Sequence, residues 1–347
     1  MGLIGIIHDI ALKLPFAGKV RQGLKRLKKP VHRRRMIRYN SETSSPPDHP
    51  RVLVMMNTGI GNAVEATPLV QAIRIHWPKA HITLYTPGGD LFEDWNVPDE
   101  VTSFPDPLSG RTFDHTFEIW SVDPPIPDSD NYPDKGIVHP LPFTGTYWLK
   151  PEREYNLDMI RALGYRGPAP PLYVSMKRPQ IEIPDGQPFI GLVPGSKNDF
   201  MWRHKRWPYF TDLSTRLMDE YPEALIAVIG GPDDRFDPPQ PDNRRLLDLR
   251  GKLSLRETAW VLRRAVLTIG NDCGPMHIAD AVQTHALILF GPSCELKNGP
   301  RYKAEPLSVP VSCRPCQYDD LLLTCDNPRC MNDLTVDLVI DRIQSLL

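Results

Sequence analysis

Cysteine is missing from the first 272 residues of this 347-residue chain, and all six cysteines lie between positions 273 and 330. This distribution excludes the disulfide framework of a small secreted domain, in which cysteines spread through the chain. Long apolar runs are missing too, since no stretch reaches the roughly eighteen residues that span a bilayer. The sequence therefore predicts a soluble globular protein, in keeping with 41% hydrophobic and 24% charged residues.

Acidic residues are almost absent from the first 40 positions, where Asp9 stands against eleven Lys and Arg. This arm carries +10, so the remainder of a chain with net charge −1 carries −11. Apolar residues recur through the arm at near-helical spacing, which favours a basic amphipathic helix on an anionic membrane surface. A solvated extension is the alternative. Nucleic-acid binding is disfavoured, because the arm offers few aromatic side chains for base stacking.

Prolines number 38 and cluster in connecting segments, which helps to place domain boundaries. The predicted organisation has four parts. They are a basic arm and linker (1–45), an N-terminal domain (46–182), a C-terminal domain (183–330) and a final helix that we expect to pack back on the first domain (331–347).

A βαβ unit spans residues 267–292. An apolar strand around Val266–Ile269 leads into a glycine-rich turn, a short helix from Met276 to Val282, and a second strand at Ala286–Phe290. The turn places backbone N–H groups at a helix N-terminus, where they suit a phosphate. Asp272 and His277 flank it and could bind hydroxyls or a phosphate. Alternatively, Asp272 is the helix N-cap and His277 an ordinary satisfied side chain.

Two further strand–turn–helix units suggest a Rossmann-like half at each end of the chain. The first has the strand Arg51–Met56 and a turn containing Gly59 and Gly61, but the third glycine of the dinucleotide fingerprint is missing, which disfavours NAD. In the second, the strand Phe189–Val193 is followed by Pro194–Lys197. Four cationic or imidazole side chains then precede Pro208 at a helix start, which predicts an anion site.

Residues 272–292 resemble the C-terminal signature of glycosyltransferase family 9, the bacterial heptosyltransferases. Asp272, Gly274, His277 and Ala281 fit its D-T-G-x-x-H-x-x-A pattern, and Phe290-Gly291-Pro292 follows. Cys273 replaces the usual Thr. The resemblance implies a GT-B fold, with two Rossmann-like domains facing a cleft. The acceptor would lie on the N-terminal side and the nucleotide-sugar on the C-terminal side.

The same resemblance assigns roles around the anion site. The segment containing Gly195, Ser196 and Lys205 is similar to the family's P-G-S/A…K-x-W-P element. Lys205 takes the position of the phosphate-facing lysine and Ser196 that of the phosphate-binding hydroxyl. Together with the turn and helix at 272–277, these residues form the predicted donor site.

The catalytic base is the point at which the chain departs from the family. Asn62 stands where the family has its catalytic acid, and an amide cannot accept a proton from a hydroxyl at pH 7. Glu65 follows one helical turn later. We therefore expect Glu65 to be the general base and Asn62 to bind the acceptor. The alternatives are that Glu65 is a surface carboxylate, or that the base is one of three other acids, Asp90, Glu93 and Asp94.

The expected function is metal-independent, inverting transfer of a sugar from a nucleoside-diphosphate donor, with ADP-heptose favoured, to a hydroxyl of lipopolysaccharide or another surface glycan. No cofactor is required. The acceptor would be lipid-linked or a polysaccharide, the basic arm would hold the enzyme at the cytoplasmic face of the inner membrane, and no nucleic acid would bind. A non-catalytic sugar- or nucleotide-binding protein and a nucleotide-sugar epimerase remain alternatives.

Two possible metal motifs lie outside this scheme. Asp128-Ser129-Asp130 matches the D-x-D pattern of metal-dependent glycosyltransferases, but it lies in a proline-rich segment and is interpreted as a solvated loop. Four cysteines have C-x2-C-x8-C-x4-C spacing, which suits either a structural zinc or four reduced thiols. They are Cys313, Cys316, Cys325 and Cys330.

Overall fold

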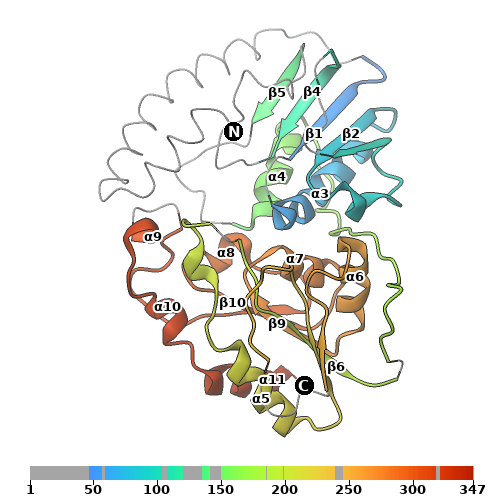
Figure 1. The fold of residues 1–347 in the computed structure, drawn as a ribbon. Coiled ribbons are helices and arrows are strands. Elements are labelled where there is room, and N and C mark those ends of the chain that lie inside the picture. Colours follow the sequence, from blue (N-terminus) through green and yellow to red (C-terminus); the bar gives the residue numbers. More distant parts are fainter. Residues whose placement is uncertain are drawn as a thin grey trace.

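A computed structural model describes residues 47–56, 59–103, 108, 110–119, 135–140, 150–184, 186–197, 199–238, 245–317 and 321–346. The predicted basic arm and the Asp128-Ser129-Asp130 loop lie outside these residues. The described chain forms two lobes, one above the other in Figure 1, each built on its own parallel sheet. No helix within the described ranges is long and apolar enough to cross a membrane.

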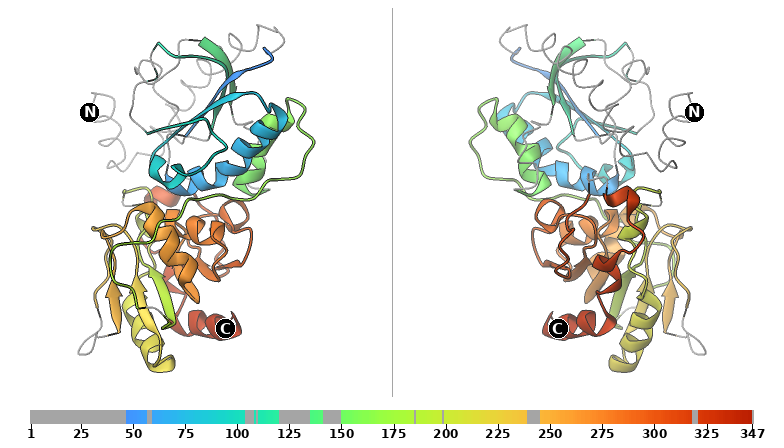
Figure 2. Two further views of the ribbon diagram at one scale, coloured as in Figure 1. Left: turned by 90° about the vertical axis from the view of Figure 1, so that its right-hand side faces the viewer. Right: turned by 90° about the vertical axis from the view of Figure 1, so that its left-hand side faces the viewer.

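The N-terminal lobe contains a five-stranded sheet in the order β3-β2-β1-β4-β5. Its strands are β1 (Arg51–Met55), β2 (His81–Thr86), β3 (Glu100–Ser103), β4 (Thr112–Glu118) and β5 (Lys135–Pro140). The helices of this lobe are α3 (Ile60–His76), the 3-10 turn η1 (Gly89–Phe92) and α4 (Glu152–Arg161). Figure 2 shows α3 and α4 on the side of the sheet that faces the other lobe.

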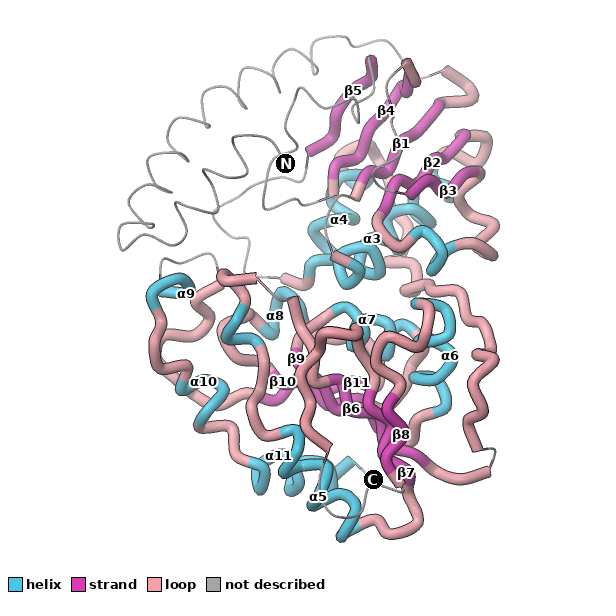
Figure 3. The backbone as a smooth tube through the Cα atoms, in the orientation of Figure 1, coloured by secondary structure: helices cyan, strands magenta, loops and turns pink. Residues whose placement is uncertain are grey.

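The C-terminal lobe contains a six-stranded sheet in the order β11-β10-β9-β6-β7-β8, visible as the magenta strands inside the lower lobe of Figure 3. Its strands are β6 (Phe189–Val193), β7 (Leu225–Val228), β8 (Leu246–Asp248), β9 (Leu267–Asn271), β10 (Ala286–Leu289) and β11 (Ala304–Leu307). The longer helices are α5 (Phe210–Glu220), α6 (Leu255–Arg264), α7 (Gly274–Ala281) and α11 (Val336–Leu346). The short ones are η2 (Arg203–Lys205), α8 (Glu295–Asn298), α9 (Leu321–Thr324) and α10 (Arg329–Asn332).

Side-chain alternation along the strands divides the core. On β6, Ile190 and Leu192 pack towards α5 and α11, whereas Phe189 and Val193 face the opposite side of the sheet. That opposite side, with α6 and α7, joins the core of the N-terminal lobe in one continuous apolar cluster. The two lobes are thus packed together, and α3 and α7 meet at their junction.

Most elements around the motifs were correctly predicted, and α6 in addition begins with a capping box between Ser254 and Glu257. The C-terminal helix corrects one expectation. Among the described residues it packs on the C-terminal lobe, where Val339, Ile340 and Ile343 bury their side chains in the cluster shared with α5. Arg216 of α5 also pairs with Asp337 at 3.1 Å.

Candidate active site

The strand order of each sheet reverses at one place, between β1 and β4 and between β6 and β9. In open parallel sheets, ligands bind beyond the carboxyl ends of the strands at such a reversal. The turns that leave β6 and β9 contain the predicted donor residues. The fold therefore directs Ser196 and Asp272 to one crevice from positions 76 residues apart.

Asn271, the last residue of β9, holds this crevice together. Its buried Nδ2 donates to the carbonyl oxygens of Pro194 at 2.7 Å and Gly195 at 3.3 Å. Its Oδ1 accepts from the backbone N–H of Trp207 at 3.0 Å. One side chain therefore fixes the turns after β6 and η2 against β9. Sequence reasoning missed this role, since Asn271 read only as part of a glycine-rich turn.

Lys205 and Asp272 meet in the crevice. Lys205 Nζ lies 2.8 Å from Asp272 Oδ2, which also accepts from Asn298 Nδ2 at 3.0 Å. Burial raises the pKa of Asp272, but the cations Lys205 and His277 outweigh it and hold that pKa well below its usual range. Asp272 is thus an ionised partner of Lys205. It is not the helix N-cap, a position that Cys273 occupies without a side-chain hydrogen bond.

The other predicted donor residues surround this ion pair. The buried Ser196 Oγ has no hydrogen-bond partner among the described residues, so it is available to a ligand. Burial raises the pKa of the Cys273 thiol to about 12, so it is neutral at physiological pH. Gly195 lies so close to the Asp234 carboxylate that a side chain would not fit there.

Two glycines allow α3 and α7 to approach closely. A Cβ on Gly61 would lie 2.6 Å from Cδ2 of His277, and one on Gly274 would lie 3.1 Å from Cβ of Ile60. Gly59, the N-cap of α3, has open space around it. Asn62 is half-buried in the first turn of α3, where its N–H donates to the Gly59 carbonyl at 3.1 Å. The close approach brings α3 side chains against the donor turn.

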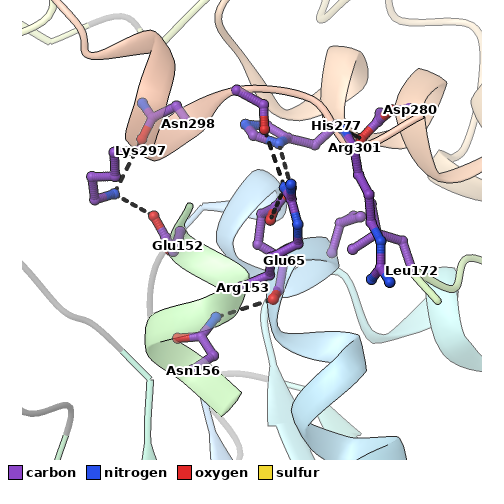
Figure 4. Close-up of polar contacts among 12 residues, drawn as sticks. Glu65, Glu152, Arg153, Asn156, Leu172, His277, Asp280, Lys297, Asn298 and Arg301 are labelled. Atoms are coloured by element: carbon purple, nitrogen blue, oxygen red, sulfur yellow. Dashed lines mark hydrogen bonds and ion pairs between the residues drawn. The ribbon is translucent and has the colours of Figure 1, made fainter. Parts of the chain in front are cut away.

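Glu65 is not a surface carboxylate: it is 2% exposed and faces α7. Its Oε1 lies 3.2 Å from His277 Nδ1, and its Oε2 lies 3.5 Å from the Arg153 guanidinium of α4 (Figure 4). Burial raises the pKa of Glu65, yet His277 and Arg153 together bring it below its ordinary value. Glu65 is therefore ionised, as a proton acceptor must be. Arg153 gave no sequence signal, because its role depends on how α4 packs beside α3.

His277 joins the two halves of the site. While Nδ1 contacts Glu65 of the N-terminal lobe, Nε2 lies 3.7 Å from Asp272 Oδ1 in its own lobe. Burial lowers the pKa of the imidazole, but the neighbouring carboxylates of Asp272 and Glu65 raise it to about 10. His277 is thus an imidazolium at neutral pH. An alternating row of charges, Arg153–Glu65–His277–Asp272–Lys205, runs from one lobe to the other.

Two more buried interactions join the lobes beside this row. Lys297 of α8 pairs with Glu152 of α4, and Arg153 donates to the Gly299 carbonyl at 3.2 Å. Away from the row, Arg256 of α6 pairs with Glu93 at 2.6 Å and with Asp94. The two alternative bases Glu93 and Asp94 are therefore engaged by an arginine. Asp90 is half-buried, and burial raises its pKa.

The four-cysteine motif lies near α9 and α10. Cys316 and Cys330 are buried, Cys325 is half-buried and Cys313 is exposed. Burial and the neighbouring Cys330, Cys313 and Cys325 raise the pKa of Cys316 to about 12. Across the described residues, no three His, Cys, Asp or Glu side chains are arranged to hold a metal ion. The zinc therefore stays a prediction.

Comparisons with known proteins find relatives in sequence and in fold. Residues 162–321 match the model of glycosyltransferase family 9 (heptosyltransferase). A lipooligosaccharide heptosyltransferase 2 from Campylobacter jejuni is 23% identical over 325 residues, which cover 85% of this chain and 99% of that protein.

Two solved structures share the fold. The ADP-heptose LPS heptosyltransferase II of Escherichia coli has a TM-score of 0.64 at 15% identity, covering 85% of this chain and 98% of its own. A family 9 glycosyltransferase from Veillonella parvula has a TM-score of 0.65 at 16% identity, covering 88% and 99%.

Two Rossmann-like lobes, each built on its own parallel sheet, give the chain the GT-B fold of these structures. In sequence, residues 162–321 are similar to glycosyltransferase family 9, and the similarity to the Campylobacter jejuni heptosyltransferase extends over 85% of the chain.

Proposed function

We propose that the protein transfers a heptose or a related sugar from an ADP-linked donor to a hydroxyl of lipopolysaccharide or lipooligosaccharide, with inversion and without a catalytic metal. The observation that carries this proposal is the juxtaposition of an ionised Glu65 with the Lys205–Asp272 pair across the lobe junction. The relative from C. jejuni is named for lipooligosaccharide, and solved neighbours contain ADP or ADP-heptose.

The chemistry divides between the lobes. Glu65 takes the proton of the acceptor hydroxyl while that oxygen bonds to the anomeric carbon. The bond from this carbon to the diphosphate breaks, and its electron pair leaves with the phosphate oxygen. Lys205, Ser196 and the backbone at the start of α7 stabilise the developing charge, so the protein itself supplies the positive field. Attack opposite the leaving group inverts the anomeric centre.

Substrates need the lobes to separate. Glu65 and Asp272 are each 2% exposed, so neither contacts solvent while α3 and α7 are packed together. We therefore assign this arrangement to the closed enzyme. Opening would break the Glu65–His277 contact and expose both halves of the site.

The function is tested by incubating the protein with ADP-heptose and a lipopolysaccharide core that lacks the terminal heptose. We expect the acceptor's mass to rise by one sugar, and ADP-, but not GDP- or UDP-linked, sugars to raise the melting temperature by mass action. Sugar conversion without acceptor would instead indicate an epimerase. Donor binding without turnover would indicate a non-catalytic protein.

The basic arm extends the proposal to location. With eleven cations in residues 1–40, we propose that it holds the enzyme at the anionic cytoplasmic face of the inner membrane, where a lipid-linked acceptor would be found. We expect the full chain to co-sediment with phosphatidylglycerol vesicles at low salt and to dissociate at high salt. Removal of residues 1–40 should abolish co-sedimentation without lowering transfer to a soluble acceptor. Equal sedimentation of both forms would refute this role.

The cysteine motif is the last part of the proposal. The chemistry of four thiols suits zinc or iron, and one solved neighbour is an iron-containing glycosyltransferase. Elemental analysis of the purified chain decides between the two alternatives: about one metal ion per chain, lost in Cys316→Ser, would indicate a structural metal. Metal-free protein with an unchanged melting temperature would favour reduced thiols.

A further inference from the structure

The row Arg153–Glu65–His277–Asp272–Lys205 contains three cations and two anions, and every member is at least partly buried. The exposed fractions of the side chains are 2% for Glu65, 3% for Asp272 and 11–13% for the three cations. Because charges interact strongly where water is excluded, a change of partner at one end must affect the next pair. The row begins on α4 and α3 in one lobe and ends at the donor crevice in the other.

His277 is held asymmetrically. Its contact with Glu65 is 3.2 Å and its contact with Asp272 Oδ1 is 3.7 Å, while the other oxygen of that carboxylate, Oδ2, is engaged by Lys205 at 2.8 Å and Asn298 at 3.0 Å. Lys205 and His277 thus compete for one carboxylate. A diphosphate, with at least two negative charges, is a stronger partner for Lys205 than Asp272 is.

The surroundings of His277 contain one more acid. Asp280 on α7 is 1% exposed, and its two oxygens accept the backbone N–H groups of Arg301 at 2.6 Å and Tyr302 at 2.8 Å. Burial raises the pKa of Asp280. With both oxygens engaged by backbone donors, Asp280 does not replace Asp272 or Glu65 as a partner of the imidazolium. The exchange is therefore confined to Glu65, His277, Asp272 and Lys205.

We propose that His277 is a positioning residue that links donor binding to release of the base. A bound diphosphate pairs with Lys205 in place of Asp272, and Asp272 then pairs with His277. His277 thereby leaves Glu65, which is free to accept the proton of the acceptor. This inference rests on the proposed function of the site. No bond to carbon changes in the exchange, and the imidazolium keeps both its protons. Glu65 loses its nearer cation and becomes a stronger proton acceptor. The donor would therefore bind before the acceptor can react.

In this exchange Glu65 opposes donor binding, because it holds the His277 side chain that must replace Lys205 at Asp272. This opposition gives a test that needs no turnover. ADP is titrated calorimetrically into wild type, Glu65→Gln, His277→Asn and the double variant. We expect Glu65→Gln to bind ADP about five- to tenfold more tightly, at the lower end of the roughly 5- to 150-fold effects that are typical of coupling between sites. His277 is then free to replace Lys205 at Asp272. With His277→Asn as background, Glu65→Gln should change the Kd by less than about twofold.

This double-mutant cycle distinguishes the proposed exchange of ion-pair partners from a simple effect of charge on ADP binding. Removing the Glu65 charge also makes the site more positive, but that through-space effect would strengthen ADP binding equally in both backgrounds. Equal strengthening, or none in either, overturns the proposal. His277→Gln repeats the cycle if His277→Asn folds poorly by circular dichroism. Arg256→Gln is the matched control, because it breaks an ion pair between the lobes outside the row and should leave the Kd within about twofold.

The two proposals fail in different ways. If wild type binds ADP but the cycle shows no coupling through His277, only the exchange is wrong and the donor assignment stands. If wild type binds none of ADP, GDP and UDP, the donor assignment fails and the exchange falls with it.

Discussion

Glu65→Gln is expected to lower the rate of sugar transfer by about 10²- to 10⁴-fold, the range typical of a lost general base. An amide cannot take the acceptor's proton, while its shape still fits beside His277 and Arg153. ADP binding should not weaken, so the loss should appear in kcat. The measurement is the initial rate of transfer at saturating donor, together with an ADP titration of the same preparation.

Stability must be measured in parallel, since Glu65 is a buried ion-pair partner. Removing one member of a buried pair can cost about 3–5 kcal/mol. The remaining imidazolium keeps Asp272, and Arg153 keeps the Gly299 carbonyl, which limits the loss. A melting temperature above the assay temperature would assign the rate effect to chemistry.

The competing acids provide the controls. Glu93→Gln should change the rate by less than about threefold, because Glu93 pairs with Arg256 away from the row. If Glu65→Gln keeps full activity and Asp90→Asn loses it, the base is Asp90. Restoration of part of the rate by Asn62→Asp in the Glu65→Gln variant would show that a carboxylate one turn earlier reaches the same hydroxyl.

How much of this site could be predicted differs between residues. The turn around Asp272 and the segment with Lys205 were predicted because their spacing resembles a family and each follows an apolar strand. The environment of Glu65 could not be predicted, since its burial depends on His277, which lies 212 residues later and in the other lobe. Arg153 and Asn298 gave no signal for the same reason: their partners are set by tertiary packing.

The fold likewise contains elements that could be predicted from the sequence and elements that could not. The central strands β1, β6, β9 and β10 are apolar runs, so periodicity identified them. The four strands at the sheet edges were missed, among them β3, in which no residue is buried. β8 has three half-buried residues, β11 contains Pro306, and β5 ends in a proline. The amphipathic pattern of α11 predicted a helix with one buried face, but such a pattern does not say which neighbour covers it.

Lys205→Met is expected to lower kcat/KM for the donor by about 10²- to 10³-fold, as when one preorganised donor of charge stabilisation is lost. Lys205 is the cation nearest Asp272 and lies at the end of η2, beside the crevice formed by β6 and β9. Without it, the leaving diphosphate keeps the Ser196 hydroxyl and the backbone of α7 but loses its fixed positive charge. The readouts are the transfer rate as a function of donor concentration and the Kd of ADP.

Lys205→Arg separates charge from shape. It keeps the charge but spreads it over a planar fork, so we expect a partial loss that lies between wild type and Lys205→Met. Ser196→Ala should have a smaller effect, about tenfold, because one uncharged hydrogen bond contributes about 0.5–1.5 kcal/mol. If Lys205→Met transfers sugar at the wild-type kcat/KM, the charge that stabilises the diphosphate comes from elsewhere, and the ion pair with Asp272 is structural. An unchanged melting temperature with a large kinetic loss would show that Asp272, still held by His277 and Asn298, does not need Lys205 for folding, and that the lysine serves the donor.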